Sequence, residues 1–412
     1  MSVSARHLAL DILVEWERGD VFAHELMDRA VHRHQLAHRD AALLQTLVFT
    51  VLRNVSLLDC LLDEICDNKH LETRIHWLLR LGAAQLLLLE MPAHAAVNET
   101  VALASEKPRG LANAVLRRAD RERERLLAFA DKLPLHERFS QPDWLVARWT
   151  QQLGEVNTKR LCDWNQLPAD TYVRINRLHP QPLGAQETSE LGKTSHPEFL
   201  AVAQPPREWL ALGRCYVQDP STAVACDLLA PLPGETILDA CAAPGGKAAC
   251  LAQLMGNRGR LIACDASARR AERLRTNLER LNVTIAETPV VDWAVSGAAA
   301  FGGLQFDRIL VDAPCSNTGV MRRRVDVRWR LQPWFFKDMA KQQLAILQAV
   351  TPMLRPGGTL VYSTCSLDRE ENEDVVQALL QQHRALKLVE TRTTTPWQDG
   401  VDGAYAAKLV KK

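Results

Sequence analysis

Residues 237–247 decide the fold of this chain, and they read Ile237-Leu238-Asp239-Ala240-Cys241-Ala242-Ala243-Pro244-Gly245-Gly246-Lys247. An aliphatic run that ends in an acid is typical of a buried strand, and the small residues after it are typical of a tight turn into a helix. Small residues let backbone N–H groups approach a ligand closely, and the start of a helix favours anionic groups. We therefore predict a parallel α/β sheet with a cofactor loop made of Cys241, Ala242, Ala243, Pro244, Gly245, Gly246 and Lys247.

Two acids downstream of the loop indicate which cofactor it binds. Asp265 follows the next predicted strand, about 20 residues after Gly246, which is the offset at which a Rossmann acid reaches the hydroxyls of a ribose. The loop lacks the G-x-G-x-x-G pattern and contains Pro244, which disfavours nicotinamide and flavin cofactors. S-adenosylmethionine fits better. Asp292 follows another short strand, where it could accept a hydrogen bond from the adenine amino group or serve only as a loop acid or helix cap.

Two cysteines follow hydrophobic runs that we predict to be buried parallel strands. One motif, after residues 308–311, is Asp312-Ala313-Pro314-Cys315-Ser316, and the other, after residues 359–362, is Ser363-Thr364-Cys365-Ser366. The carboxyl ends of parallel strands meet at one edge of a sheet, where such sheets hold ligands and reactive groups. We therefore expect both thiols to face one cleft. The alternative is that both cysteines are small core residues, as most isolated cysteines are.

Paired thiols beside a loop for a methyl donor favour covalent methyl transfer. An aromatic carbon is a poor nucleophile, but a thiolate that adds to carbon 6 of cytosine makes carbon 5 nucleophilic. A free thiol is mostly protonated at neutral pH, so the site must lower its pKa or remove its proton. Asp312 is placed to hydrogen-bond the polar edge of the cytosine and to stabilise the added charge, and we also expect it to contact the cofactor. The spacing does not decide which of Cys315 and Cys365 is the nucleophile.

The net charge of +1 gives no global sign of nucleic-acid binding, so any contact with a polyanion must come from local patches. The arginines between Arg117 and Arg125 alternate with Glu122 and Glu124, which favours a solvated helix face. A denser patch after Cys315 has only one acid to offset five arginines. We predict that this patch contacts RNA phosphates beside the cleft, with a structural ion-paired cluster as the alternative. Its members are Arg322, Arg323, Arg324, Arg328 and Arg330.

The chain has 412 residues, which is long enough for two or three domains. Residues 1–135 show only helical periodicity and predict an all-α bundle. Residues 141–215 mix helical and strand patterns, with prolines that mark loops, and predict a small α/β connector domain. Strands and helices alternate in residues 216–412, which predicts the catalytic α/β domain.

The ten cysteines are scattered, and several lie inside apolar runs, so we expect reduced thiols in a cytoplasmic protein and no disulfide framework. No close cluster of histidine and cysteine has the spacing of a zinc site, and we expect no metal. The longest apolar stretch, near residues 86–89, is flanked by Gln85 and Glu90, so we expect no membrane span.

Over nearly its whole length the chain resembles the Sun family of RNA cytosine-5 methyltransferases. Residues 239–247 match the cofactor signature of that family, residues 312–316 its proline-cysteine motif and residues 363–366 its threonine-cysteine motif. Residues 92–101 and 109–117 are similar to the NusB-like RNA-binding domain of the bacterial subgroup that acts on 16S ribosomal RNA. The resemblance implies an α/β fold: a Rossmann-like S-adenosylmethionine methyltransferase sheet, preceded by a NusB-like all-α bundle and a small α/β middle domain.

The resemblance also implies the roles of the cysteines and the substrate. Cys365 is expected to be the nucleophile, and Cys315 to assist release of the methylated base. The expected substrate is 16S ribosomal RNA, naked or in an early assembly intermediate, with no obligate protein partner. Two alternatives stay open: the same chemistry on transfer RNA or large-subunit ribosomal RNA, and a non-catalytic RNA-binding factor of ribosome assembly. The fit to cofactor and RNA is also open at four positions that depart from the family pattern: Ala248, Cys250, Arg324 and Ala404.

Overall fold

The computed structural model describes residues 3–66, 71–295 and 301–412, and the chain divides into two compact units. The helical unit consists of Met1–Leu167 and Val325–Arg330, and the sheet unit of Pro168–Arg324 and Leu331–Lys412. We call Val325–Arg330 the arginine segment; it belongs to the helical unit although the chain on both sides of it belongs to the sheet unit. The three-domain division predicted from the sequence stays a prediction.

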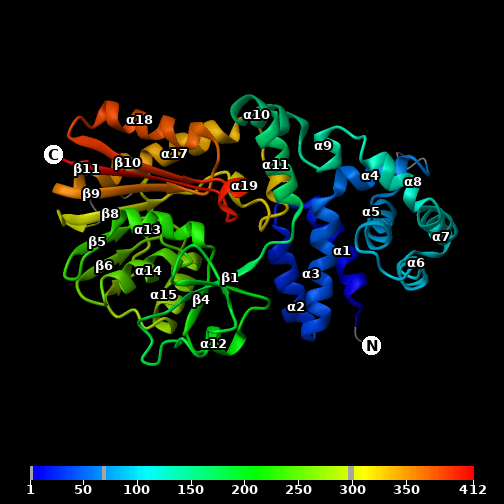
Figure 1. The fold of residues 1–412 in the computed structure, drawn as a ribbon, viewed down its shortest axis with the longest axis horizontal. Helices are drawn as coiled ribbons and strands as arrows, with labels where there is room; N and C mark the ends of the chain where they lie inside the picture. Colours follow the sequence, from blue (N-terminus) through cyan, green and yellow to red (C-terminus); the bar gives the residue numbers. More distant parts are fainter. Residues whose placement is uncertain (1–2, 67–70, 296–300) are drawn as a thin grey trace. The chain divides into compact units, whose positions relative to one another are not determined.

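The described part of the helical unit is built of helices, as expected for the N-terminal region. Its elements (Figure 1) are α1 (Ala5–Arg18), α2 (Ala23–His34), α3 (His38–Arg53), α4 (Val55–Asp63), α5 (Thr73–Ala83), the π-helical turn η1 (Ala84–Leu88), α6 (Ala93–Val101), α7 (Glu106–Arg121), α8 (Arg123–Ala130), α9 (Leu135–Arg138), α10 (Asp143–Leu153), α11 (Glu155–Gln166) and α16 (Val327–Arg330). Apolar residues at helical spacing, such as Leu10 and Leu13 of α1, are fully buried in its core. Val325 of the arginine segment joins the same core.

The arginines of α7 and α8 lie on an exposed, ion-paired surface. Arg118 pairs with Glu122 at 2.7 Å, and Arg125 pairs with Glu122 at 2.8 Å and with Glu64 at 2.9 Å. The prediction of a solvated helix face in this region is confirmed.

Asp326 of the arginine segment completes the start of α2. Its carboxylate accepts hydrogen bonds from the backbone N–H of Ala23 (2.7 Å) and from Trp16 Nε1 (3.2 Å). Ala23 is the first residue of α2, and Phe22 before it makes no capping hydrogen bond with its side chain. Asp326 therefore supplies the acceptor that an N-cap residue ordinarily supplies, at the positive end of the helix dipole.

Arg328 and Arg330 bind backbone carbonyls of the helical unit. Arg328 is fully buried and donates to the carbonyl oxygens of Phe139 (3.2 Å) and Asn165 (3.1 Å). Arg330 donates to the carbonyl oxygen of Trp16 (3.0 Å), and its guanidinium carbon lies 5.0 Å from the centroid of the Trp16 ring. The prediction that these two arginines contact RNA phosphates is wrong, because carbonyls and a ring from distant parts of the sequence already occupy their guanidinium groups.

The sheet unit contains two sheets. The smaller sheet is antiparallel, with the order β2-β3-β1-β4, and its strands are β1 (Thr171–Ile175), β2 (Gly192–Lys193), β3 (Phe199–Val202) and β4 (Cys215–Val217). The larger sheet has the order β10-β11-β9-β8-β5-β6-β7, and its strands are β5 (Thr236–Asp239), β6 (Arg260–Ala263), β7 (Ala286–Glu287), β8 (Phe306–Asp312), β9 (Leu354–Thr364), β10 (Leu386–Thr394) and β11 (Ala404–Lys411).

The larger sheet is mixed. Strands β9, β8, β5, β6 and β7 are parallel, whereas β11 and β10 add antiparallel at one edge. The prediction of a Rossmann-like α/β fold is confirmed, and the antiparallel edge is the feature that the parallel pattern of the sequence did not include. Such an edge is common on an otherwise parallel sheet.

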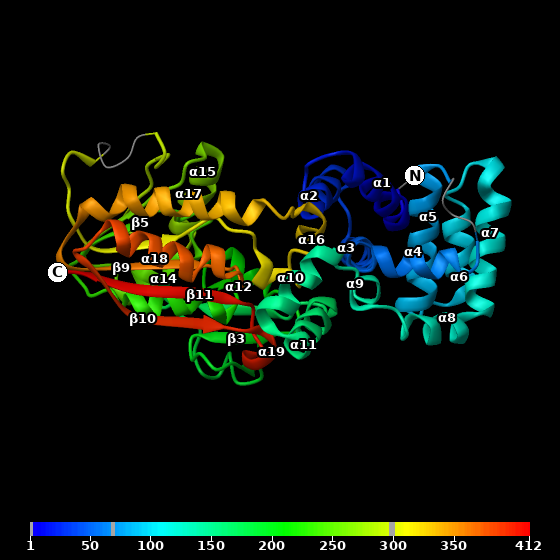
Figure 2. The same cartoon turned by 90° about the horizontal axis from the view of Figure 1, so that it is seen from above.

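Helices cover both faces of the larger sheet (Figure 1). The helical elements of the unit are α12 (Arg207–Ala211), η2 (Pro220–Thr222), α13 (Ala223–Leu229), α14 (Gly246–Leu254), α15 (Ala268–Arg280), η4 (Thr318–Val320), α17 (Phe335–Val350), η5 (Thr351–Met353), η6 (Arg369–Glu371), α18 (Glu373–Gln382) and α19 (Pro396–Asp399). Leu360 packs with α17 and α18, and Val361 packs with α13, α14 and α15, because neighbouring strand residues point to opposite faces. Figure 2 shows α17 and α18 running along the strands.

The strand register brings three chain segments to one edge of this sheet. Asp312 at the end of β8 pairs with Ser363 of β9, and Asp239 at the end of β5 pairs with Leu310 of β8. The cofactor loop and both cysteine motifs therefore leave the sheet at the same edge, as the sequence predicted.

The described residues contain neither a single helix that could span a membrane nor a cluster of metal-binding side chains. No single helix among them is long and apolar enough to cross a membrane; only α3 and α4 together reach that length and composition, and they are bent by 71°. Residues 3–66, 71–295 and 301–412 contain no group of three or more histidine, cysteine or acidic side chains that could hold a metal ion.

Replacing Asp326 by alanine should destabilise the helical unit by about 2 kcal/mol, because α2 loses its cap and the Trp16 N–H loses its acceptor. Arg324→Ala is the matched control, because Arg324 is exposed and lies just outside the arginine segment. Urea unfolding of the full-length protein, followed by far-UV circular dichroism, measures both variants. Equal unfolding midpoints for Asp326→Ala and the wild type would contradict the capping role.

Candidate active site

The cofactor loop leaves β5 and enters α14 through two glycines. Gly245 has a φ of +110°, in the left-handed region that side chains rarely adopt, and it occupies the N-cap position of α14. A Cβ atom on Gly246 would lie 2.9 Å from the ring of Tyr216, so a larger residue does not fit without movement. The peptide between Ala243 and Pro244 is cis. This turn brings the loop backbone to the start of a helix, a position that suits a polar or anionic ligand group.

Asp239, at the end of β5, is a buried acid that the sequence analysis quoted only as part of the cofactor signature. It is fully buried, and neither of its carboxylate oxygens accepts a hydrogen bond of normal geometry from the described residues, although the backbone N–H of Cys241 acts on it and lowers its pKa slightly. Burial, with the nearby Asp312 carboxylate, raises the pKa of Asp239 to about 7. A buried acid without donors is costly unless a bound group supplies them. Asp239 therefore fits a ligand that brings an N–H donor or a positive charge to the loop.

Asp265 and Asp292, which were predicted to accept hydrogen bonds from ribose and adenine, follow β6 and β7. Asp265 is buried; it accepts a hydrogen bond from the backbone N–H of Ser267 (3.0 Å) and pairs with Arg270 at 3.2 Å. Asp292 is exposed and accepts from the backbone N–H of Ala294 (2.9 Å). Both acids have local partners, so their contacts with ribose and adenine stay predictions.

An ion pair joins the cofactor loop to the first cysteine motif. Lys247 Nζ lies 2.7 Å from Asp312 Oδ2, and the Ser363 hydroxyl donates to Asp312 Oδ1 at 3.2 Å. Burial lowers the pKa of Lys247, but the Asp312 carboxylate outweighs this effect, so the pKa ends above its ordinary value and the ammonium keeps its proton. Lys247 of the loop and Ser363 of β9 thus hold the Asp312 carboxylate in place together.

The two cysteine motifs bring their thiols into contact. The Sγ atoms of Cys315 and Cys365 are 3.2 Å apart, and Cys365 Sγ also donates to Asn317 Oδ1 at 3.2 Å. The expectation that the strand ends place these thiols together is confirmed. Cys315 is buried and Cys365 is half-buried. The hydrogen bond with Cys365, followed by burial, raises the pKa of Cys315 well above its ordinary value, so Cys315 is the thiol that resists ionisation.

The arginines next to Cys315 are ion-paired and do not form a free phosphate clamp. Arg322 is 2% exposed and pairs with Asp170 at 3.3 Å. Arg323 pairs with Asp219 at 2.6 Å and with Asp402 at 2.5 Å. The prediction that Arg322 and Arg323 contact RNA is wrong, because acids 79 to 152 residues away supply their counter-charges. Only the ion-paired alternative agrees with these contacts.

Arg324, the next residue, is exposed, whereas Arg322 is buried and Arg323 is half-buried. The contact of Arg324 with RNA stays a prediction.

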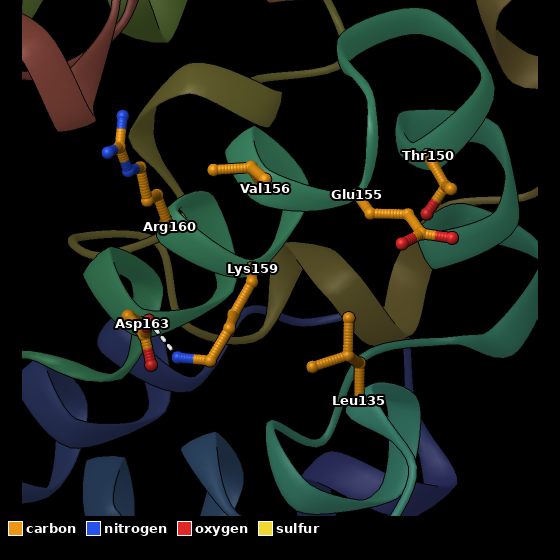
Figure 3. A pocket seen from close by; sticks show the side chains of 7 residues that line it. All are labelled: Leu135, Thr150, Glu155, Val156, Lys159, Arg160 and Asp163. Atoms are coloured by element: carbon orange, nitrogen blue, oxygen red, sulfur yellow. Dashed lines mark hydrogen bonds and ion pairs between the residues drawn. The ribbon is translucent and has the colours of Figure 1, made fainter.

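An open pocket of about 630 Å³ lies in the helical unit, among side chains of α9, α10 and α11 (Figure 3). Lys159 and Asp163 on its wall pair with each other at 2.7 Å. None of the predicted catalytic or cofactor residues lines it. Three residues at this sheet edge were not singled out from the sequence as site residues: Asp239 beside the cofactor loop, and Asn317 and Glu371 beside the thiols. The sequence signal available for Asp239 is its position as the last residue of a strand before the cofactor loop.

Comparison with known proteins identifies the relatives of both units. The family model of 16S rRNA methyltransferase RsmB/F matches residues 226–410, and that of the NusB family matches residues 3–121. The chain is 37% identical over 405 residues to ribosomal RNA small subunit methyltransferase B of Erwinia tasmaniensis, with 91% of each protein covered. It is 36% identical over 417 residues to the probable ribosomal RNA small subunit methyltransferase B of Synechocystis sp., with 96% of this chain and 93% of the relative covered.

A solved structure is also similar. The crystal structure of a methyltransferase homolog protein from Pyrococcus horikoshii matches with a TM-score of 0.59 and 26% identity, covering 68% of this chain and 98% of the other. The match to the NusB family confirms the NusB-like assignment of the N-terminal helices.

Replacing Asp265 by alanine should weaken S-adenosylmethionine binding by about 1.5 to 3 kcal/mol, because the cofactor loses hydrogen bonds to a charged group. RNA affinity should hardly change. Glu272→Ala is the control, since Glu272 is an exposed acid of α15, the helix that follows Asp265, and it pairs with Arg275 at 2.9 Å. Calorimetric titration measures the dissociation constants, and thermal unfolding checks the fold. A dissociation constant unchanged in Asp265→Ala would show that this acid does not bind the cofactor.

Proposed function

The chain belongs to the 16S rRNA methyltransferase RsmB/F family, and we propose that it methylates carbon 5 of one cytosine in 16S ribosomal RNA through a covalent cysteine–cytosine adduct. It is an RNA methyltransferase, and its cofactor is S-adenosylmethionine. The observation that carries the cytosine-5 chemistry is the pair of thiols, Cys315 and Cys365, 3.2 Å apart at the sheet edge where the cofactor loop ends.

The residues around the cofactor loop fit S-adenosylmethionine. When bound, this cofactor supplies an electrophilic methyl group. The residues that would hold it are those of the loop, Cys241 to Lys247, with Asp265 and Asp292 as acceptors. The unpartnered carboxylate of Asp239 supports the fit, because the cofactor carries an amino group and a sulfonium cation.

Cys365 is the better nucleophile of the two thiols. Its side chain is partly exposed, whereas Cys315 is buried and held in the protonated state. Cys365 gives its proton to solvent, and its sulfur forms a bond to carbon 6 of the cytosine, which makes carbon 5 electron-rich. After carbon 5 has gained its methyl group, its proton passes to solvent, the double bond between carbons 5 and 6 forms again, and the Cys365 sulfur leaves carbon 6 as a thiolate. Cys315, 3.2 Å from Cys365 Sγ, is placed to act in this release.

Asp312 and Lys247 act on the polar edge of the cytosine during the addition. Attack at carbon 6 pushes electron density onto that edge, and the Lys247 ammonium supplies the positive charge that stabilises it. The Asp312 carboxylate, held by Lys247 and Ser363, accepts a hydrogen bond from the exocyclic amino group and orients the ring. Charged groups that are already oriented stabilise such an adduct without further reorganisation.

The NusB-like helices favour 16S ribosomal RNA as the substrate over transfer RNA or large-subunit RNA. The matched relatives are named as small-subunit enzymes, and the substrate we propose is naked RNA or an early assembly intermediate in the cytoplasm. A non-catalytic assembly factor would not need two thiols in contact beside Asp312. Bisulfite sequencing of ribosomal RNA from cells with and without the gene tests the assignment: one cytosine of 16S RNA should lose its protection when the gene is deleted, and unchanged protection throughout 16S RNA would overturn it.

The Cys365→Ala variant should lose methyl transfer and keep cofactor binding, because the thiolate adds to the ring and does not hold the adenosine. Transfer of tritium from labelled S-adenosylmethionine measures turnover, and calorimetry measures cofactor affinity. Turnover at a tenth of the wild-type rate or more would rule out Cys365 as the nucleophile.

The Cys315→Ala variant should accumulate a covalent protein–RNA species, because a residue that acts in release is needed only after the methyl group has moved. Denaturing gel electrophoresis detects this species as a shifted band. The double variant Cys315→Ala/Cys365→Ala is the control and should give no band. A band of equal strength in both variants, or in neither, would contradict the division of roles.

A further inference from the structure

We propose that Glu371 is a positioning residue whose buried carboxylate ties the two cysteine loops together and thereby sets the distance between the thiols. Glu371 ends the short helix η6 and is fully buried. Its hydrogen bonds go to Ser316 and Ser366, the residues next to the thiols, so its action on the thiols passes through these neighbours. The inference rests on the proposed function, in which Cys365 adds to the base and Cys315 acts in its release.

Both oxygens of the Glu371 carboxylate contact the cysteine loops. Oε2 accepts from the backbone N–H of Ser316 at 2.9 Å, and Oε1 accepts from the Ser366 hydroxyl at 2.7 Å. The Ser316 hydroxyl also donates to Oε1. Ser316 directly follows Cys315, and Ser366 directly follows Cys365. One carboxylate therefore joins the residues next to both thiols.

Gln343 of α17 completes the set of donors. Its side-chain amide donates to Glu371 Oε2 at 2.9 Å and to the carbonyl oxygen of Pro314 at 2.9 Å. The carboxylate thus receives four hydrogen bonds, two at each oxygen. Burial raises the pKa of Glu371, and the Ser316 and Ser366 hydroxyls oppose that effect. The number of donors fits an ionised carboxylate, because a carboxylic acid would have to turn one of its own O–H bonds toward them.

Neighbouring side chains hold the second cysteine loop against the same segment. Asn372 donates to the carbonyl oxygen of Ser366 at 2.9 Å and accepts from the Thr364 hydroxyl at 2.6 Å. Asp368 accepts from the Thr318 hydroxyl at 2.7 Å. The loops also meet where the Gly319 N–H donates to the Cys365 carbonyl oxygen at 2.9 Å. Glu371 is the group among these that bonds to the residue after each thiol.

The charge of Glu371 has a second effect, on Cys315. After the hydrogen bond with Cys365, burial and the charge of Cys365, the Glu371 carboxylate is a further cause of the raised pKa of Cys315. The same group that fixes the two loops thus helps keep Cys315 protonated while Cys365 is available as the nucleophile. A misplacement of about 1 Å at a reacting centre can cost 100-fold in rate, so this bracing has a measurable consequence.

Glu371→Gln tests the inference because it keeps the shape and replaces one accepting oxygen with an N–H₂ group. Oxidation of the full-length protein with diamide joins two thiols in a disulfide while the diamide gains both electrons and both protons. The rate at which the Cys315–Cys365 disulfide appears, followed by peptide mass spectrometry, reports the thiol separation independently of methylation. We expect this rate and kcat both to fall about 10- to 100-fold, with the dissociation constant of S-adenosylmethionine unchanged.

Glu373→Gln is the matched control, since Glu373 is an exposed residue two positions further along the chain. It should leave the disulfide rate and kcat as in the wild type. If Glu371→Gln does not fold, Ser366→Ala is the second variant, because it removes only one of the four hydrogen bonds to the Glu371 carboxylate. It should slow disulfide formation and methylation less strongly than Glu371→Gln. The positioning role would be overturned if folded Glu371→Gln or folded Ser366→Ala formed the disulfide and methylated RNA at the wild-type rates.

The two proposals fail in different ways. If the wild type makes no 5-methylcytosine but Glu371→Gln slows disulfide formation, the function is wrong and the bracing is right. If Cys365→Ala abolishes methylation but Glu371→Gln changes neither rate, the function is right and the positioning role is overturned.

Discussion

The ion pair between Lys247 and Asp312 is the interaction on which the candidate site depends. It connects Lys247, the last residue of the cofactor loop and part of the first turn of α14, to the motif that carries Cys315. The parallel register makes the pair possible, because β5 and β8 are neighbouring strands that end at the same edge. Only 17% of the Lys247 side chain is exposed, so its charge is stable there because a carboxylate lies beside it. One contact therefore links the cofactor loop to the motif that carries Cys315.

The features that local sequence decides were predicted well. A hydrophobic run of strand length followed by a polar or small residue located the ends of β5, β8 and β9, and parallel pairing then placed Cys315 and Cys365 together. The helical periodicity of the N-terminal residues likewise predicted an all-α region. These predictions succeeded because residues close together in the sequence set the burial pattern, which repeats every 2 residues in a strand and every 3.6 residues in a helix.

The features that depend on distant partners could not be predicted. Arg322, Arg323 and Arg328 were interpreted as phosphate contacts because only one acid is close to them in the sequence, yet the fold brings them Asp170, Asp402 and backbone carbonyls. A guanidinium group binds carboxylates, carbonyls and phosphates with the same N–H donors. Local charge counting therefore identifies a group that needs acceptors, and only the tertiary structure identifies which acceptors it has.

Two buried carboxylates show how the same side-chain chemistry serves opposite purposes at this sheet edge. Glu371 receives four hydrogen bonds from the cysteine loops and α17, so its charge is satisfied within the protein and its role is to hold structure. Asp239 accepts no hydrogen bond of normal geometry from the described residues, and burial with Asp312 nearby raises its pKa to about 7. A buried carboxylate with so few donors is costly unless a bound group or water supplies them. The Glu371 carboxylate thus has its donors within the protein, whereas both oxygens of Asp239 can still accept hydrogen bonds.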